Sequence, residues 1–340
     1  MQTSRRLTHT ILALLAVAVL STAALAADPG VPYPITSEAS DQKAGSILVY
    51  NYYTSAAAPS PTHNTRVNIT NTNPTLGVVM HLFFVAEGCS TADFKLPMSP
   101  NFTFVINVAE FDPGFNGYII AVATDTDTGA PINFNFVIGD EYFKLPNGTA
   151  ANLGAVAFTA LYGETGTIAP NYVADATTAD LLFNGITDPL LANGYNRIPA
   201  TVAVSNIPSR LDGNETTLIL NNLSGDLSQT MNSVPRLFVL VYDDQENPFS
   251  ASLAPGACQK RVVLSDAEPR IPRRLSAVIP AGRSGWMRIQ TTLGTTPLLG
   301  AVVNYNPSTA TRADVFNGGH NLHALTLVDT TTITMPVYPF

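Results

Sequence analysis

The sequence has 340 residues, of which 46% are hydrophobic and only 12% are charged, and its formal net charge is −8. This length suits two domains that each bury a core, and the apolar content argues against a disordered chain. The negative charge and the lack of a dense basic patch argue against nucleic acid as a partner.

The N-terminus has the pattern of a secretory signal peptide. Arg5 and Arg6 precede an apolar run over residues 11–20, and an Ala-Leu-Ala cleavage pattern ends at Ala26. We therefore predict a signal peptide over 1–26 and export through the general secretory route. The expected location is the extracellular space or the cell surface, with the periplasm as the alternative, and no transmembrane segment is expected after cleavage. Residues 27–44 are predicted to be an extended leader.

Alternating or continuous apolar runs predict strands over 46–53, 66–71, 102–108, 118–124, 132–138 and within 154–162. The run 78–86 is almost entirely apolar, which is typical of a strand buried on both faces. Turn signals such as Asp112-Pro113-Gly114 separate these runs. No alternation of helices and strands supports a parallel α/β sheet.

Parts of the sequence recur at an offset of about 170 residues, which indicates an internal repeat. Gly88-Cys89 aligns with Ala257-Cys258, Asn147-Gly148 aligns with Asn317-Gly318, and residues 132–135 align with 303–306. Reuse of common turns in a β-rich chain is the alternative explanation. We predict an all-β protein of two tandem homologous Ig-like antiparallel β-sandwich domains, over 45–165 and 196–340. A linker with short helical turns is predicted over 166–195.

The two cysteines, Cys89 and Cys258, fall at matching places in this alignment. A bridge between them would need the same edge of both domains to meet, so we expect two free, buried thiols. Pairing between two molecules is the alternative.

Charge is divided unevenly between the predicted domains. Residues 45–165 contain three basic and nine acidic side chains, whereas residues 195–340 contain eleven and ten. Part of the basic charge is concentrated in one stretch, which gives three interface candidates: Arg270, Arg273 and Arg274. An acidic and a locally basic domain could meet head to tail in neighbouring molecules, although a solvated strand face explains the same pattern.

The C-terminal residues 333–340 alternate apolar and polar side chains and predict a final edge strand of the second domain. The alternative hypothesis is that this strand is donated to a neighbouring subunit. The side chains that would fill the partner are Ile333, Met335, Val337 and Phe340.

Carboxylates at alternate or adjacent positions suggest two weak calcium sites, one at Asp125 and Asp127 and the other at Asp243 and Asp244. A hairpin turn is the simpler and favoured explanation of the first pair. No other cofactor is expected. His81 opens an apolar strand and is interpreted as a hydrogen-bonded core or edge residue rather than a catalytic base.

No nucleophile elbow, zinc motif or phosphate-binding loop is present. The leading hypothesis is a secreted or cell-surface, non-enzymatic structural or adhesive protein that self-assembles into fibres or layers. Its partners would be further copies of itself, or a glycan or protein outside the cell. The first alternative is a carbohydrate-binding tandem module, and the second is a secreted hydrolase.

Overall fold

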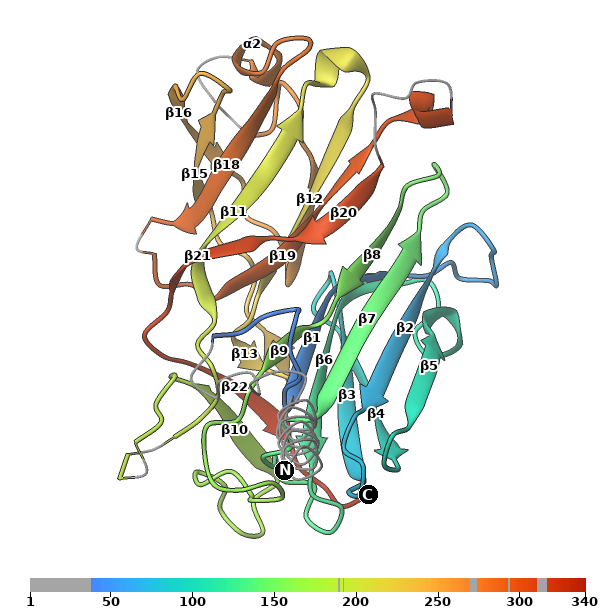
Figure 1. The fold of residues 1–340 in the computed structure, drawn as a ribbon, viewed down its shortest axis with the longest axis vertical. Coiled ribbons are helices and arrows are strands. Elements are labelled where there is room, and N and C mark those ends of the chain that lie inside the picture. The colour runs from blue at the N-terminus through green and yellow to red at the C-terminus, as the bar shows by residue number, and fades with distance from the viewer. Residues whose placement is uncertain (1–37, 189, 192, 270–273, 293, 311–316) are drawn as a thin grey trace, which may run out of the picture. The chain divides into compact units, whose positions relative to one another are not determined.

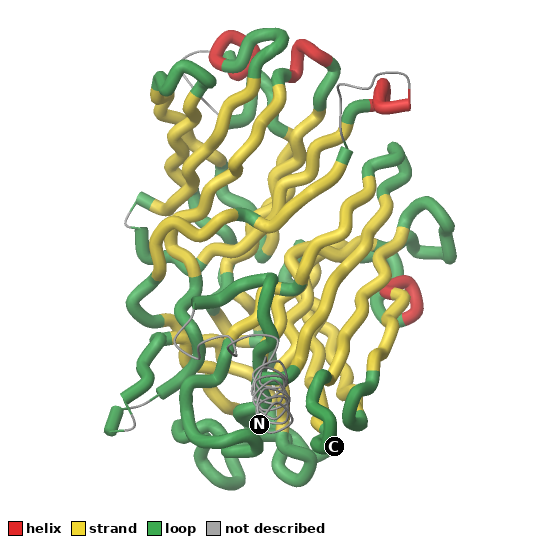
Figure 2. The backbone as a smooth tube through the Cα atoms, viewed as in Figure 1, coloured by secondary structure: helices red, strands yellow, loops and turns green. Residues whose placement is uncertain are grey.

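Strands form nearly all the regular structure of the computed structural model, which describes residues 38–340 except 189, 192, 270–273, 293 and 311–316 (Figures 1 and 2). The predicted signal peptide and most of the predicted leader lie outside the described residues. Helices in the described part are single turns: α2 (Leu275–Val278), η1 (Val108–Glu110), η2 (Arg210–Asp212) and η3 (Pro307–Ala310). None of these helices is long and apolar enough to cross a membrane.

The first half forms two antiparallel sheets that pack face to face, here called the first sandwich. One sheet has the order β4-β3-β6-β1-β9 and the other β5-β2-β7-β8. Their strands are β1 (Ile47–Thr54), β2 (Asn64–Asn71), β3 (Val78–Ala86), β4 (Thr91–Met98), β5 (Thr103–Asn107), β6 (Asn116–Thr124), β7 (Val137–Lys144), β8 (Ala150–Gly154) and β9 (Val156–Phe158). Apolar side chains such as Leu48 and Val67 fill the space between the sheets.

The second half forms another pair of sheets, the second sandwich, with the orders β16-β15-β18-β11-β21 and β17-β12-β19-β20. Their strands are β11 (Pro199–Pro208), β12 (Glu215–Asn222), β15 (Leu237–Tyr242), β16 (Pro248–Leu253), β17 (Gln259–Val263), β18 (Ser284–Thr291), β19 (Leu298–Tyr305), β20 (Gly318–Asn321) and β21 (His323–Leu327). Val202, Leu218 and Met287 belong to its core.

A fifth sheet, here called the cover sheet, has the order β10-β22-β13-β14. It combines β10 (Thr178–Phe183), β13 (Gly225–Asp226), β14 (Thr230–Met231) and β22 (Thr331–Pro336). Strand β22 pairs antiparallel with β10 and parallel with β13. Three segments far apart in the sequence therefore meet in one sheet.

The cover sheet lies on the outer face of the β4-β3-β6-β1-β9 sheet. Phe83 and Tyr118 from that face share one core with Leu181 of β10 and Met335 of β22. Both faces of the sheet are thus buried, and all nine residues of β3 are buried. The prediction that 78–86 is buried on both sides is confirmed.

Several expectations about elements were wrong. The strand predicted over 132–138 begins only at Val137, and Ile132 makes an isolated bridge to Ile168. The predicted helical turns of 166–195 are replaced, in the described residues, by strand β10. The C-terminal strand β22 is not at an edge, because it pairs on both sides. In each case pairing with a distant segment decided the structure.

The two sandwiches contact each other through an apolar cluster and a polar network. Tyr52 and Phe143 from the first pack with Ile219 and Val303 from the second. Asn51 Nδ2 donates to Asn321 Oδ1 at 2.8 Å. Side-chain amides from Asn221 and Gln259 donate to the carbonyl oxygen of Asn51, and all four of these polar residues lie on strands. Because these amide groups are bonded to each other across the boundary, the contact is specific as well as apolar.

Candidate functional site

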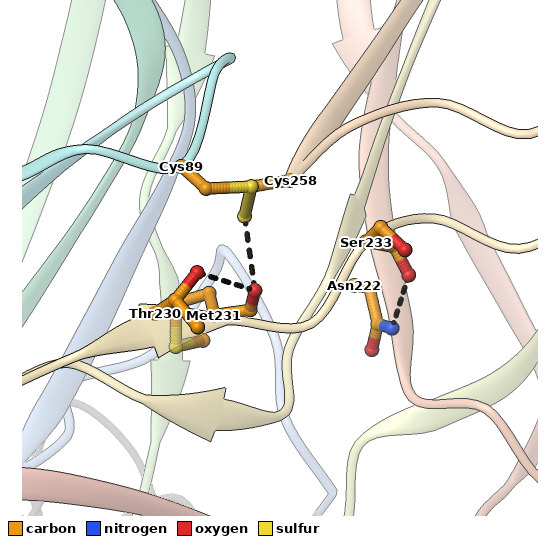
Figure 3. The surroundings of a disulfide bond; sticks show 6 residues. All are labelled: Cys89, Asn222, Thr230, Met231, Ser233 and Cys258. Carbon is orange, nitrogen blue, oxygen red and sulfur yellow. Dashed lines mark hydrogen bonds between the residues drawn. A yellow bond between two sulfur atoms is a disulfide. The ribbon is translucent and has the colours of Figure 1, made fainter.

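A disulfide joins Cys89 to Cys258 across 169 residues, with their Cα atoms 5.1 Å apart (Figure 3). Cys89 lies between β3 and β4 at a φ of 74°, and Cys258 lies between β16 and β17. The backbone N–H of Cys258 donates to Glu87 O at 3.0 Å, which brings the two loops together. Cys258 Sγ also lies 3.2 Å from the Met231 carbonyl oxygen, a contact that carries no proton because the sulfur is bonded.

The expectation of two free thiols was therefore wrong. It rested on the assumption that the two cysteines occupy equivalent places, but one follows the third strand of its sandwich and the other follows the fourth. The loops can meet because they come from different positions in the two halves. A disulfide is stable in an oxidising compartment rather than in the cytosol of most cells.

The C-terminal residues that sequence reasoning offered to a neighbouring molecule lie against their own chain. Ile333, Met335 and Val337 are buried in the core that the cover sheet shares with the first sandwich, whereas Phe340 is 59% exposed. The last residue is held by its backbone, since Phe340 N donates to Thr126 O at 3.1 Å. Strand donation to another subunit would require this sheet to be taken apart.

A group of polar side chains anchors the tail beyond β22. Tyr338 donates its hydroxyl to Asp93 Oδ2 and lies 3.1 Å from His81 Nε2. His81 Nε2 is 2.7 Å from the same carboxylate oxygen, although His81 is fully buried. Lys95 donates to the carbonyl oxygen of Tyr338, and its Nζ lies 3.9 Å from the centre of the tyrosine ring. We call these four residues the tail anchor.

Titration of the tail anchor depends on its burial. Burial lowers the pKa of His81, and the hydrogen bond to Asp93 only partly opposes this effect. Burial alone would raise the pKa of Asp93, but the hydrogen bonds from His81 and Tyr338 hold it below its usual value. Burial and the bond to Asp93 raise the pKa of Tyr338. At neutral pH the arrangement is therefore a neutral imidazole and a phenol on one carboxylate.

His81 and Asp93 form a His–acid pair of the kind that a hydrolase would need. His81 is sealed under the tail, and its Nδ1 atom is buried without a hydrogen-bond partner among the described residues. The interpretation of His81 as a hydrogen-bonded core residue agrees with this position. The pair holds the chain terminus and presents no accessible base.

The second sandwich has an outer sheet face that lacks a cover among the described residues. We call it the open face; its side chains are Phe238, Leu240 and Tyr242 on β15 and Trp286, Arg288 and Gln290 on β18. They are exposed or half-buried, and they alternate with buried core residues. Tyr242 and Trp286 stack with their rings 4.3 Å apart and inclined by 4°.

The same face in the first sandwich is fully covered. Val85 pairs with Tyr118 where β3 meets β6, just as Tyr242 pairs with Trp286 where β15 meets β18. Val85 and Tyr118 have no exposed surface, and they belong to the same core cluster as Leu181 of β10 and Met335 of β22. The open face is thus the position that the cover sheet occupies in the first sandwich.

Of the three predicted basic candidates, one lies within the described residues. Arg270 and Arg273 lie outside the described residues. Arg274 is exposed and sits at the N-cap position of α2. The capping interactions there come from Asp266, whose carboxylate accepts from Ser276 N at 2.8 Å and from the Ser276 hydroxyl.

The four calcium candidates are placed in two separate turns. Asp125 accepts from the Thr128 backbone and hydroxyl, and Asp243 accepts from Gln245 N and Asn247 N. Asp244 pairs with Arg283 at 2.8 Å. Asp127 is exposed beside the first turn. The described residues contain no group of three or more His, Cys, Asp or Glu side chains that could hold a metal ion.

Two buried ionisable groups were not singled out from the sequence. Burial raises the pKa of Glu141 well above its usual value, although Tyr52 N donates to Glu141 Oε1 at 3.1 Å. Burial lowers the pKa of Lys43 to about 8, and its Nζ donates to Asn196 Oδ1 at 2.6 Å and to the Thr159 hydroxyl. Lys43 therefore connects the segment before β1 to two others: the segment after β9, which contains Thr159, and the segment before β11, which contains Asn196.

The sequence matches no protein-family model, and a search of curated proteins finds no match. One solved structure, described as "Crystal Structure of Thermotoga maritima 1070", is similar over 36% of this chain and 98% of its own, with 14% identity and a TM-score of 0.26. A likeness of that size carries no argument about fold or function.

Proposed function

We propose that this chain is a secreted or cell-surface, non-enzymatic structural or adhesive protein that self-associates through the open face. The observation that carries the proposal is the contrast between the two halves: one sheet face is covered by the chain itself, and the matching face is left with aromatic and aliphatic side chains at the surface. Contiguous apolar patches on a stable protein usually mark interaction sites.

We propose further that the halves are two tandem Ig-like sandwiches derived by duplication. Their strand orders are the same, and both first strands bulge at the same place, between Tyr50 and Tyr53 and between Val204 and Ile207. In both, a glycine allows close approach of the neighbouring strand. A Cβ on Gly117 would lie 1.9 Å from Val85 O, and one on Gly285 would lie 2.4 Å from Tyr242 O.

A second copy of this chain is the occupant that we favour for the open face. The only charged side chain of the face is Arg288, and its Nε is buried without a hydrogen-bond partner among the described residues. The first sandwich region, with nine acidic and three basic side chains, supplies the opposite charge. Contact between different surfaces of the two copies would propagate as a fibre or close as a ring.

Two features support a location outside the cytosol. The disulfide fits an oxidising compartment, and the N-terminal sequence has the pattern of a secretory signal. Together with the cover sheet and the tail anchor, the disulfide ties the halves at several points. Such redundancy suits a protein that has to persist outside the cell.

Sedimentation velocity over a range of concentrations tests the self-association. The purified protein is expected to form assemblies that Phe238→Ser and Arg288→Glu each abolish. Leu211→Ser is the matched control, because Leu211 is 61% exposed and lies in η2 rather than on β15 or β18. A wild-type protein that remains monomeric at every concentration, or variants that assemble unchanged, would refute the proposal.

A carbohydrate-binding module is the second candidate. The Tyr242–Trp286 pair does not favour it, since each ring covers one face of the other and no flat two-ring platform results. The observation that does favour it is a hollow on the first sandwich around Tyr142. For a secreted hydrolase we find no comparable support, because the imidazole of the His81–Asp93 pair is buried.

A further inference from the structure

A shallow hollow of about 280 Å³ lies on the outer face of the β5-β2-β7-β8 sheet. It is lined by Arg66 of β2, Tyr142 and Lys144 of β7, and the loop residues Ser60 and Pro61, among others. Its volume is near the lower end of those of small-ligand sites.

Two of the three basic side chains within residues 45–165 line this one hollow. The third, Lys95, belongs to the tail anchor. Arg66 lies directly opposite Tyr142 in the β2–β7 ladder, so Lys144 is its diagonal neighbour. Diagonal neighbours of this kind lie roughly 7–8 Å apart, and two like charges there repel each other.

No carboxylate of the described residues forms an ion pair with these two cations, although Asp140 is also a diagonal neighbour of Arg66 in the ladder. Among the described residues, neither Arg66 nor Lys144 has an ion-pair partner within salt-bridge distance. The nearest acid along β7, Asp140, accepts instead from Asn68 Nδ2 at 2.9 Å. Glu110 accepts from Asn107 Nδ2 at 2.9 Å. Two cations that are held side by side without an ion pair provide a site for an anion.

The aromatic ring between the cations narrows the class of ligand. Tyr142 is 39% exposed, and Lys144 Nζ lies 5.6 Å from its ring centre. An exposed tyrosine offers a flat apolar surface with a polar tip, whereas arginine binds a carboxylate with two parallel hydrogen bonds. The acidic surroundings repel densely charged polyanions such as nucleic acids or sulfated glycans.

We propose that this hollow binds an acidic saccharide, with a sugar carboxylate on Arg66 and Lys144 and the sugar ring against Tyr142. The proposal does not depend on self-association, because the hollow and the open face belong to different sandwiches. It assigns the second candidate function a ligand class, namely a chain of uronic acid units with one carboxylate per ring.

Isothermal titration calorimetry with a tetramer of galacturonic acid tests the site. Binding to the wild type is expected, and the Arg66→Gln/Lys144→Gln double variant should weaken it at least about tenfold. Tyr142→Ala should also weaken it. The control removes two exposed cations elsewhere, Arg236→Gln/Arg274→Gln, and should bind as the wild type does. All four substituted cations are exposed, so circular dichroism is expected to show an unchanged fold.

Four results would overturn the proposal. The first is no binding by the wild type, and the second is equal loss in both double variants, which would indicate bulk charge alone. The third is equal affinity for a neutral galactose tetramer. Tighter binding of a sulfated oligosaccharide than of the uronic acid tetramer would also contradict it, since the surrounding acids should disfavour dense charge. Failure here would leave the sedimentation result for the open face unaffected.

Discussion

Cys89 is bonded to Cys258 although the first lies after the third strand of its sandwich and the second lies after the fourth strand of the other. The bond joins two residues that are 169 positions apart in the sequence. A cross-link restricts the unfolded chain most when the loop that it closes is long. The double variant Cys89→Ser/Cys258→Ser should therefore lose about 2–5 kcal/mol of unfolding free energy. Equilibrium denaturation measures this loss. Equal stability of the variant and the oxidised wild type would contradict the prediction.

The tail anchor should make the free energy of unfolding decrease as the pH falls. The pKa of His81 is lowered from 6.5 and that of Asp93 from 3.8, so in both cases the unfolded chain binds more protons over the titration range. Their contribution is complete above pH 6.5 and is lost as pH falls through the lowered pKa values. His81→Phe should remove the part of this loss that begins near pH 6.5, as measured by denaturation from pH 8 to pH 4.

Phe is the informative replacement because Phe238 holds the matching position in the second sandwich. The variant also loses its bonds to Asp93 and Tyr338, so its absolute stability will fall. The slope with pH is the readout that distinguishes titration from lost packing. A slope identical to that of the wild type would show that His81 does not titrate with unfolding.

Glu141 should have the opposite effect. Burial raises its pKa above 4.5, so the folded protein binds more protons than the unfolded chain. Its contribution is full below pH 4.5 and is lost as pH rises through the raised value. Glu141→Gln should equal the wild type at pH 4 and exceed it in unfolding free energy at pH 8. Asp140→Asn, on the opposite face of β7, is the control and should show no such gain.

Gly129 should be intolerant of a side chain because the C-terminal tail lies against it. A Cβ there would lie 1.9 Å from Tyr338 O, at a φ of +73°. Gly166 has a φ of +90° and no atom within 4 Å of the same position, so it carries the backbone cost alone. Thermal denaturation of Gly129→Ala should show a loss greater than that of Gly166→Ala by about 1 kcal/mol or more. Equal losses of stability in the two variants would mean that the tail moves away from residue 129 without an energetic cost.

The strands with strong local patterns could be predicted from the sequence. The continuous apolar run at 78–86 predicted β3 and its two buried faces, and 66–71 predicted most of β2. Strand β4 was missed because Thr91–Met98 contains Asp93, Lys95 and Pro97 and has no clear alternation. Asp93 and Lys95 bind the C-terminal tail, which lies more than 200 residues away in the chain.

The candidate site was harder to predict because its parts come from distant segments. Nothing near Leu181 indicates that it meets Ile333, and nothing near Asp93 indicates Tyr338. The sequence did show that Ile333, Met335 and Val337 would be buried on one side of a strand, but not in which molecule. The sequence contained one signal for the hollow, because residues 45–165 include only three basic side chains. Two of them, Arg66 and Lys144, lie on neighbouring strands and are offset by two positions in the pairing.

The place of β22 has a consequence for how the chain matures. The residues of β22 are synthesised after those of the sheet that they cover, whose first strand begins at Ile47. The first sandwich therefore keeps one apolar face bare until synthesis of the chain has passed β22. A product that ends before β22 would retain that bare face and would be prone to aggregation or proteolysis.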